Sequence, residues 1–250
     1  MSNYQRNTSM VVCVFAVLIV GAIVVGAISY YGTTNWNWNP VTTDYSFQAD
    51  VGATTGTVTL DINLDAGGVN VKFVDNASLL YDIGVEVDNT TIASDGEPTV
   101  TFASNTIALD YTNAGVNITL GSGVNYTIDI VANAGGVNVE LGPGAHISDV
   151  SIQVTAGGID FVMAEDVVLV GNSTFDFEST TGGISLIVDL PPSTGGSIEC
   201  AAGVGGVHIT AVGWTEITSA HYETTDYDTA SQTLTILAET NIGGITAVLT

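Results

Sequence analysis

Apolar and polar residues alternate along most of the chain, in short runs that each follow a pair of glycines. In the copy at 134–141, Val137 and Val139 fall on one face of an extended segment, and Asn138 and Glu140 fall on the other. Such alternation predicts a strand with one buried face. The glycines before it suit a corner, because glycine accepts positive φ and has no Cβ to obstruct a neighbouring backbone.

Versions of this unit recur from residue 66 to residue 248. The first glycines of the copies are Gly67, Gly115, Gly135, Gly157, Gly182, Gly205 and Gly243. The five central ones are 20, 22, 25 and 23 residues apart, and repeats of this length are typical of solenoids. The flanking gaps of 48 and 38 residues are about two periods long. We therefore expect coils there that lack the signature or carry insertions.

Each repeat also has room for a second strand, such as the alternating segment 149–155. We predict an all-β fold, a parallel β-helix-like β-solenoid with coils of about 22 residues, over residues 47–250. Coils would stack about 4.8 Å apart and together bury a core that no single repeat can bury. The alternative is an ordinary all-β protein with scattered glycine turns, which the near-constant spacing opposes.

Residues 10–31 form a long uncharged apolar run. A helix of roughly 20 residues crosses about 30 Å of hydrocarbon, so this run predicts a transmembrane signal-anchor. Arg6 precedes it and no Lys or Arg follows before Lys72, which keeps residues 1–9 in the cytoplasm. Residues 32–46 then form a juxtamembrane linker, and the ectodomain 47–250 lies outside the cell. The competing interpretation is a cleaved signal peptide, for which Ala27-Ile28-Ser29 offers small residues.

The charge balance is one-sided because basic residues are nearly missing. Asp and Glu number 26 and Lys and Arg number 2, for a net charge of −24. Phosphate-backbone binding has no electrostatic basis in such a chain, which excludes nucleic acid as a partner. The composition indicates an exterior covered by Thr, Ser and Asn.

Five acceptor sequons for N-glycosylation fall in the predicted ectodomain. They begin at Asn76, Asn89, Asn117, Asn125 and Asn172. The predicted topology places all five outside the cell, where they are candidates for modification.

One motif imitates a calcium loop. Asp61, Asn63 and Asp65 match its D-x-N-x-D opening, but Ala66 stands at the sixth position and Lys72 at the twelfth, where Gly and Glu are required. The residues between them are apolar. The pattern therefore favours the outer face of a strand, with a loosely bound surface calcium ion as the alternative. No other metal and no cofactor is indicated.

Catalytic chemistry has little support in the sequence. Cys200 alternates with Ile198 and is expected to be buried, and Cys13 lies in the predicted span, so the two form no disulfide. Histidine, aromatic residues and carboxylates come together at 214–228. The members that could bind a cation are His221, Glu223, Asp226 and Asp228. The same segment could bind a sugar through its aromatics, or be a cap over the end of the solenoid, which open solenoids require.

The repeated glycine-pair signature after a single N-terminal span resembles the putative adhesin and toast-rack β-solenoid proteins of bacterial and archaeal surfaces. The resemblance covers roughly residues 50–250. It implies a stacked β fold in a cell-surface or envelope-stress context. It supplies no catalytic motif to carry over.

Three classes of function remain open. The favoured one is a non-catalytic adhesive, scaffold or envelope-structural protein that contacts membrane lipid through its helix, and a cell-surface glycan, a protein or further copies of itself through its ectodomain. The second is an accessory subunit of an envelope-sensing membrane complex, held through Gly21 and Gly26 of the span. The third and weakest is a polysaccharide-active enzyme, which usually needs facing carboxylates or a basic residue.

Overall fold

The computed structural model describes residues 41–250, which form one 18-stranded sheet and a short helix, α2 (Asn89–Asp95). The strands are β1 (Thr42–Asp50), β2 (Thr57–Phe73), β3 (Leu79–Asp88), β4 (Thr101–Ala103), β5 (Thr106–Leu120), β6 (Asn125–Ala134), β7 (Val137–Leu141), β8 (His146–Ala156), β9 (Ile159–Met163), β10 (Val168–Leu169), β11 (Ser173–Thr181), β12 (Ile184–Val188), β13 (Gly195–Val204), β14 (Val207–Ala211), β15 (Trp214–Thr218), β16 (His221–Thr224), β17 (Thr233–Ile242) and β18 (Ile245–Leu249). The prediction of an all-β fold is confirmed.

The predicted anchor helix at 10–31 lies outside the described residues. Within 41–250 no helix is long and apolar enough to cross a membrane. The predicted linker 32–46 is too long at its end, because β1 already begins at Thr42. Tyr45 and Phe47 alternate with exposed polar residues and pack against the core, so this segment belongs to the sheet.

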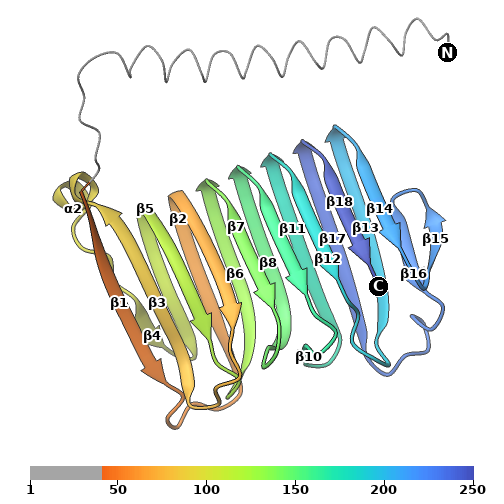
Figure 1. Ribbon diagram of the computed structural model, residues 1–250, viewed down its shortest axis with the longest axis horizontal. Helices are drawn as coiled ribbons and strands as arrows, with labels where there is room; N and C mark the ends of the chain where they lie inside the picture. Colours follow the sequence, from red (N-terminus) through yellow and green to blue (C-terminus); the bar gives the residue numbers. More distant parts are fainter. Residues whose placement is uncertain (1–40) are drawn as a thin grey trace, which may run out of the picture. The chain divides into compact units, whose positions relative to one another are not determined.

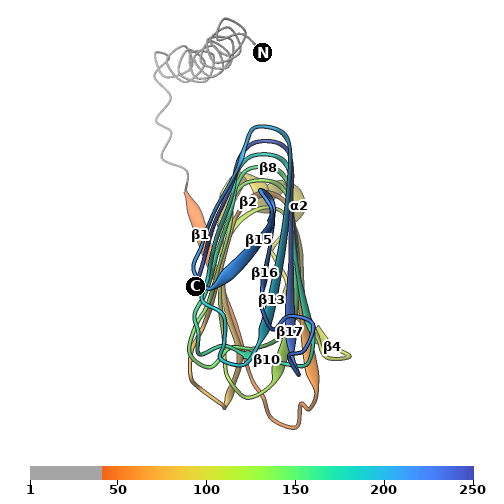
Figure 2. The same cartoon turned by 90° about the vertical axis from the view of Figure 1, so that its right-hand side faces the viewer.

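Each coil consists of two strands that meet at a glycine corner. In β2 the corner is Gly67-Gly68, and the residues before and after it pair with different strands, β6 and β7. We call the strands before the corners the first face and those after them the second face. Seen down the stack, the coils superimpose into a narrow outline with one face on each side (Figure 2).

Parallel pairing in register defines the order of the coils along the stack (Figure 1). On the first face the order is β5, β2, β6, β8, β11, β17 and β13. On the second face it is β5, β2, β7, β9, β12, β18 and β14. The coil that comes last in the sequence thus lies inside the stack, between β11–β12 and β13–β14. At the other end, β2 lies inside β5.

The two long gaps between glycine pairs contain insertions. This was one of the two alternatives predicted for them, the other being coils that lack the signature. The first gap holds β3, α2 and β4, and the second holds β15 and β16. Where coils follow one another directly, Ala134 pairs with Ala156 and Ala156 pairs with Thr181. These partners are 22 and 25 residues apart in the sequence.

The corner glycines form a column along the stack. Gly135 has φ +144°, and a Cβ on it would lie 1.5 Å from the carbonyl oxygen of Gly67. A Cβ on Gly157 would in turn lie 1.7 Å from the carbonyl oxygen of Gly135. The same approach continues through Gly182, Gly243 and Gly205. Only glycine fits these positions, which explains why the glycine recurs with each coil.

The interior is filled by the apolar residue of each alternating pair, including the rings of Phe161, Phe175 and Phe177, which meet edge-on or tilted. Both ends of this core are covered by antiparallel strands. At one end β3 pairs with β5 and β1 pairs with β3, while β4 covers the first-face side of β5. At the other end the β15–β16 hairpin pairs with β13.

The polar segment 88–98 between β3 and β4 contains helix α2. Asp88 caps the helix by accepting a hydrogen bond from the backbone N–H of Thr90 at 2.7 Å. The Tyr111 hydroxyl donates to the Gly96 carbonyl at 2.5 Å, so the end of the helix is tied back to the sheet.

Candidate functional site

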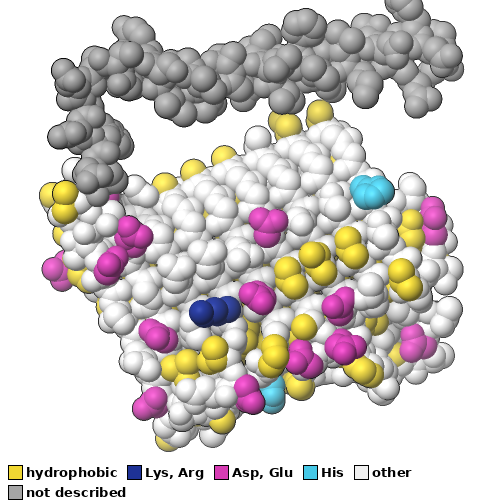
Figure 3. Space-filling model, viewed as in Figure 1, with side chains coloured by type: hydrophobic (Ala, Val, Ile, Leu, Met, Phe, Trp, Pro, Cys, Tyr) yellow, Lys and Arg dark blue, Asp and Glu magenta, His cyan; other side chains and the backbone are white. Residues whose placement is uncertain are grey.

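The second face carries two in-register rows of outward side chains (Figure 3). The upper row is Asn117, Asn70, Asn138, Asp160, Ser185, Thr246 and His208. The lower row is Thr119, Lys72, Glu140, Val162, Ile187, Val248 and Thr210. Because the coils are in register, each row runs across the face in steps of one strand spacing, about 4.8 Å.

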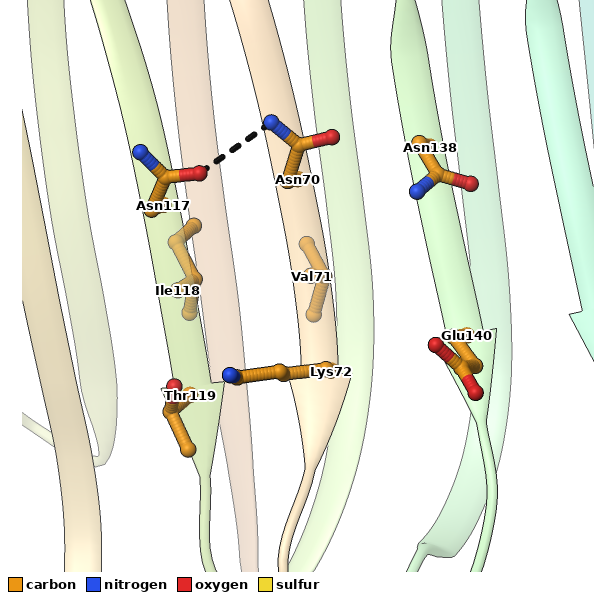
Figure 4. Close-up of a pocket in the computed structure, with 8 residues that line it drawn as sticks. All are labelled: Asn70, Val71, Lys72, Asn117, Ile118, Thr119, Asn138 and Glu140. Carbon is orange, nitrogen blue, oxygen red and sulfur yellow. Dashed lines mark hydrogen bonds between the residues drawn. The ribbon is translucent and has the colours of Figure 1, made fainter.

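A shallow hollow of about 280 Å³ lies where the two rows cross β5, β2 and β7 (Figure 4). Its polar lining comes from Asn70, Asn117 and Asn138 of the upper row and from Thr119, Lys72 and Glu140 of the lower row. The Asn70 side-chain amide donates to the Asn117 amide oxygen at 3.2 Å, which orients these two amides in line.

Lys72 is the only Lys or Arg in the described part of the chain. Its side chain extends toward Thr119, while Glu140 lies on the opposite side of it (Figure 4). Lys72 and Glu140 are register partners, yet among residues 41–250 the only contact of salt-bridge length is that between His221 and Glu223. The Lys72 ammonium and the Glu140 carboxylate are therefore both available to bind a ligand.

A second hollow of about 320 Å³ continues along the upper row. It lies over Asp160, Ser185 and Thr246, beside the corner glycines. Two of the strands that line it, β12 and β18, and the neighbouring β14 carry no carboxylate at all. Ile187 and Val248 are register partners there and are 42% and 38% exposed, so polar and apolar surface lie side by side (Figure 3).

This arrangement offers side-chain amides and hydroxyls for hydrogen bonding to a ligand. Side-chain amides offer donors and acceptors at once, and hydroxyl-rich ligands need both. The hollows are open and shallow, and none of the polar groups lining them is a nucleophile paired with a base. The face is suited to a flat or extended ligand with many hydroxyl groups.

The calcium candidates Asp61, Asn63 and Asp65 lie on the outer side of β2, on the first face. Alternate residues of a strand are about 7 Å apart, so three such side chains spread along the strand instead of surrounding an ion. Asp65 accepts a hydrogen bond from the Asn133 amide at 2.8 Å. Within the described residues no group of three acidic, His or Cys side chains could hold a metal ion.

The five sequons fall into two structural classes. Asn76, Asn89 and Asn172 are exposed in turns or at a helix start, and their side-chain oxygens accept hydrogen bonds from Ser78, Thr43 and Thr233. Asn117 and Asn125 lie within strands β5 and β6. Glycosylation of any of them stays a prediction.

The histidine-containing cluster at 214–228 forms a cap on β13, which was one of its three interpretations. Trp214 packs over Gly196, where an added Cβ would lie 2.2 Å from the indole ring. His221 lies 3.0 Å from Glu223 and 3.3 Å from the Ser197 hydroxyl. Both contacts use the same ring nitrogen, Nε2, so the three groups do not form a relay in which one nitrogen faces the acid and the other the hydroxyl.

Cys200 is 5% exposed and faces the core, as the alternation predicted. Burial, together with the charge of Glu199, raises the pKa of this thiol to about 12. The thiolate that a nucleophile requires is therefore absent at neutral pH.

Sequence reasoning placed Asn138 and Glu140 on an outward face but did not recognise the rows. The available signal was the polar residue that follows the first apolar residue of each copy. Asn70, Asn117 and Asn138 occupy that position in three copies. What the sequence did not reveal is that β2 lies between β5 and β7, which brings these three amides side by side.

No known protein family model matches the chain, and no curated protein matches it. Among solved structures, a putative cell adhesion protein from Clostridium sporogenes matches with a TM-score of 0.69 at 16% identity, over 84% of this chain and 100% of that one. A putative adhesin from Bacteroides fragilis matches with a TM-score of 0.32 at 9% identity, over 83% of this chain and 97% of that one. The first likeness shows a shared fold, so the predicted resemblance to adhesin-type structures is confirmed at the level of architecture.

Proposed function

We propose that this chain is a non-catalytic adhesive protein whose second face binds a neutral, hydroxyl-rich glycan. The observation that carries the proposal is the line of amides Asn117, Asn70 and Asn138, held in register beside the hollow that contains Lys72. The fold shared with a solved putative cell adhesion protein supports an adhesive role.

The charge of the chain selects among glycans. With 26 acidic and 2 basic residues, the molecule repels polyanions such as uronate-rich or sulfated polysaccharides. A neutral polymer of hexoses or N-acetylhexosamines meets no such barrier. Its hydroxyl and acetamido groups can exchange hydrogen bonds with the amide row, and its apolar ring faces can rest on Ile187 and Val248.

The same proposal includes presentation at the cell surface. The apolar run at 10–31 supports a single membrane anchor with the N-terminus in the cytoplasm and residues 47–250 outside. In this arrangement lipid is one partner of the chain and the glycan is the other. Protease digestion of intact cells, with a label at residue 250, tests the orientation independently of the ligand.

The binding experiment uses the full-length chain in detergent micelles on a panel of immobilised neutral and anionic oligosaccharides. We expect retention on neutral members of the panel. Replacing Asn70 and Asn138 together by Ala removes two hydrogen-bonding side chains, so binding should weaken about tenfold or more.

Asn63→Ala is the matched control, because Asn63 is an exposed asparagine on the same strand, β2, but on the first face. It should leave binding unchanged. Equal losses in the double variant and in the control, or retention on anionic glycans alone, would contradict the proposal.

A further inference from the structure

The coil formed by β17 and β18 is an internal element of the stack. β17 pairs in parallel with β11 on one side and with β13 on the other. β18 does the same with β12 and β14. Its inward residues are all buried: Leu234, Ile236, Ala238, Thr240, Ile245, Ala247 and Leu249. Residues 233–250 therefore fill the position between β11–β12 and β13–β14, with a hydrogen-bonded strand ladder on each side. We call this position the acceptor slot.

Because of their order in the sequence, both walls of this slot are synthesised before residues 233–250, which fill it. β11–β12 and β13–β14 precede residues 233–250 in the sequence but stand two coil positions apart in the stack. Their connection contains Pro191 and Pro192, which have no N–H to donate and cannot join a ladder. This stiff connection suits the path of the chain from β12 to β13, which bypasses the acceptor slot.

Residues 232–250 are held against the walls of the slot by hydrogen bonds as well as by the strand ladders. Gln232 donates through its amide to the carbonyl oxygens of Leu169 and Gly171, at 2.6 and 3.0 Å. The N–H of Thr233 donates to the side-chain oxygen of Asn172 at 3.2 Å. At the far end, the N–H of Leu190 donates to the carbonyl oxygen of Thr250 at 3.0 Å. None of these contacts depends on the peptide link to β16.

Until the slot is filled, it presents four strand edges and the core between them. Unpaired edges are templates for strand addition, and addition of an extended segment in register is a common mode of recognition. The sequence that matches these edges residue by residue is 233–250, and every copy of the chain carries it. Exchange of an identical element needs no new contacts.

We propose that the acceptor slot also binds residues 233–250 of a second copy of this chain, so that copies are joined by exchange of this coil. The short turn at 225–232, closed by hydrogen bonds from the N–H groups of Thr229 and Ala230 to the Asp226 carbonyl, is the hinge. Exchange in pairs gives a closed dimer, and exchange along a row gives a chain of copies. Either outcome joins the adhesive faces of several molecules.

The test uses two register partners on the first face, Glu178 of β11 and Glu239 of β17. Two full-length chains with different tags, one carrying Glu178→Cys and the other Glu239→Cys, are co-expressed in a background in which Cys13 and Cys200 are replaced. After mild oxidation, a disulfide between the two tags forms where the coil of one copy occupies the slot of the other. We expect this mixed product to appear.

Two controls make the result decisive. A single chain carrying both substitutions must form the disulfide between positions 178 and 239, either within one copy or between two copies, and its absence in both forms would show that the slot itself is wrongly assigned. Gln153→Cys and Glu178→Cys on separate chains form the matched pair, because these residues are also register partners but lie in coils that exchange leaves in one molecule. A mixed Glu178–Glu239 product no more abundant than this background would overturn the proposal.

Discussion

At the residue scale, the fold depends on a column of glycines that no other residue can replace. Gly67, Gly135 and Gly157 each have positive φ and each place their Cα against the carbonyl oxygen of the previous coil. A side chain there would force neighbouring coils apart at the corner. The second glycine of each pair is under no such constraint, as Gly136 shows: its nearest neighbour would be 3.9 Å from an added Cβ.

We expect Gly135→Ala to lower the free energy of unfolding by about 3 kcal/mol or more, because it combines a strained φ with a backbone clash. Gly136→Ala, one residue away, should change it by less than about 0.5 kcal/mol. Urea denaturation of both variants measures the difference. Similar effects at the two positions would show that the glycine column does not set the coil spacing.

Like charges also meet across strands. Asp61 and Asp129 are register partners, and desolvation, with the charge of Asp61, raises the pKa of Asp129. A carboxyl group whose pKa is raised by folding favours the folded state below its ordinary pKa, and this contribution is lost as the pH rises through the folded value. The ionised pair therefore opposes folding at neutral pH.

Asp129→Asn should accordingly raise the free energy of unfolding at pH 7 by a few tenths of a kcal/mol, the usual size of a like-charge pair across strands. At a pH low enough to protonate Asp129 the gain should vanish. Asp160→Asn is the control, since its register partners Asn138 and Ser185 are neutral. Thermal unfolding across the pH range checks both, and a pH-independent gain would argue against repulsion.

At the element scale, position in the sequence and position in the stack are different things. β18 comes late in the sequence but has a strand on each side, whereas β14 pairs only with β18. Half of the backbone hydrogen-bonding groups of β14 thus lack a ladder partner among the described strands. The inward residues Val207 and Ile209 of this edge strand are only half-buried.

Amide hydrogen exchange should reveal that β18 is internal to the stack and β14 lies at its edge. We expect the amides of β17 and β18 to be among the slowest to exchange, because they open only when the stack opens. The outward-pointing amides of β14 should exchange much faster. Mass spectrometry of peptides covering 204–212 and 243–250 gives the comparison, and equal rates for the two would contradict an internal position for the last coil.

At the scale of the whole molecule, all 26 carboxylates and a single Lys lie within residues 41–250. Lys72 and Glu140 sit at one end of the second face, and strands β12, β18 and β14 toward its other end carry no carboxylate. The first face carries Asp61, Asp129, Asp176, Glu178 and Glu239. The two sides of the same stack therefore offer different surfaces, which suits binding through one of them.

Self-repulsion of this charge should make stability depend on ionic strength. Raising NaCl from about 0.01 M to about 1 M shortens the Debye length from about 30 to about 3 Å, so the unfolding temperature should rise. Calcium and magnesium chlorides at matched ionic strength should act alike, because Asp61, Asn63 and Asp65 lie along a strand. A calcium-specific rise that Asp61→Asn abolishes would establish a calcium site there.

The all-β class, the glycine corners and the inward position of Cys200 could be predicted from the sequence, because they follow from local rules. Alternation decides which face of a strand is buried, and positive φ decides where glycine must stand. The cap formed by 214–228 was one of three interpretations that local patterns left open. Helix α2 was missed because a seven-residue helix without buried residues leaves no periodic signal.

The order of the coils was decided only in three dimensions. Each coil presents the same apolar rows and the same backbone ladder to both neighbours, so the local pattern is equally compatible with several orders. Placing residues 233–250 inside the stack, and β2 inside β5, depends on how the insertions and the Pro191-Pro192 connection span the coils. For the same reason the row of amides on the second face, to which strands distant in sequence contribute, could be recognised only from the tertiary structure.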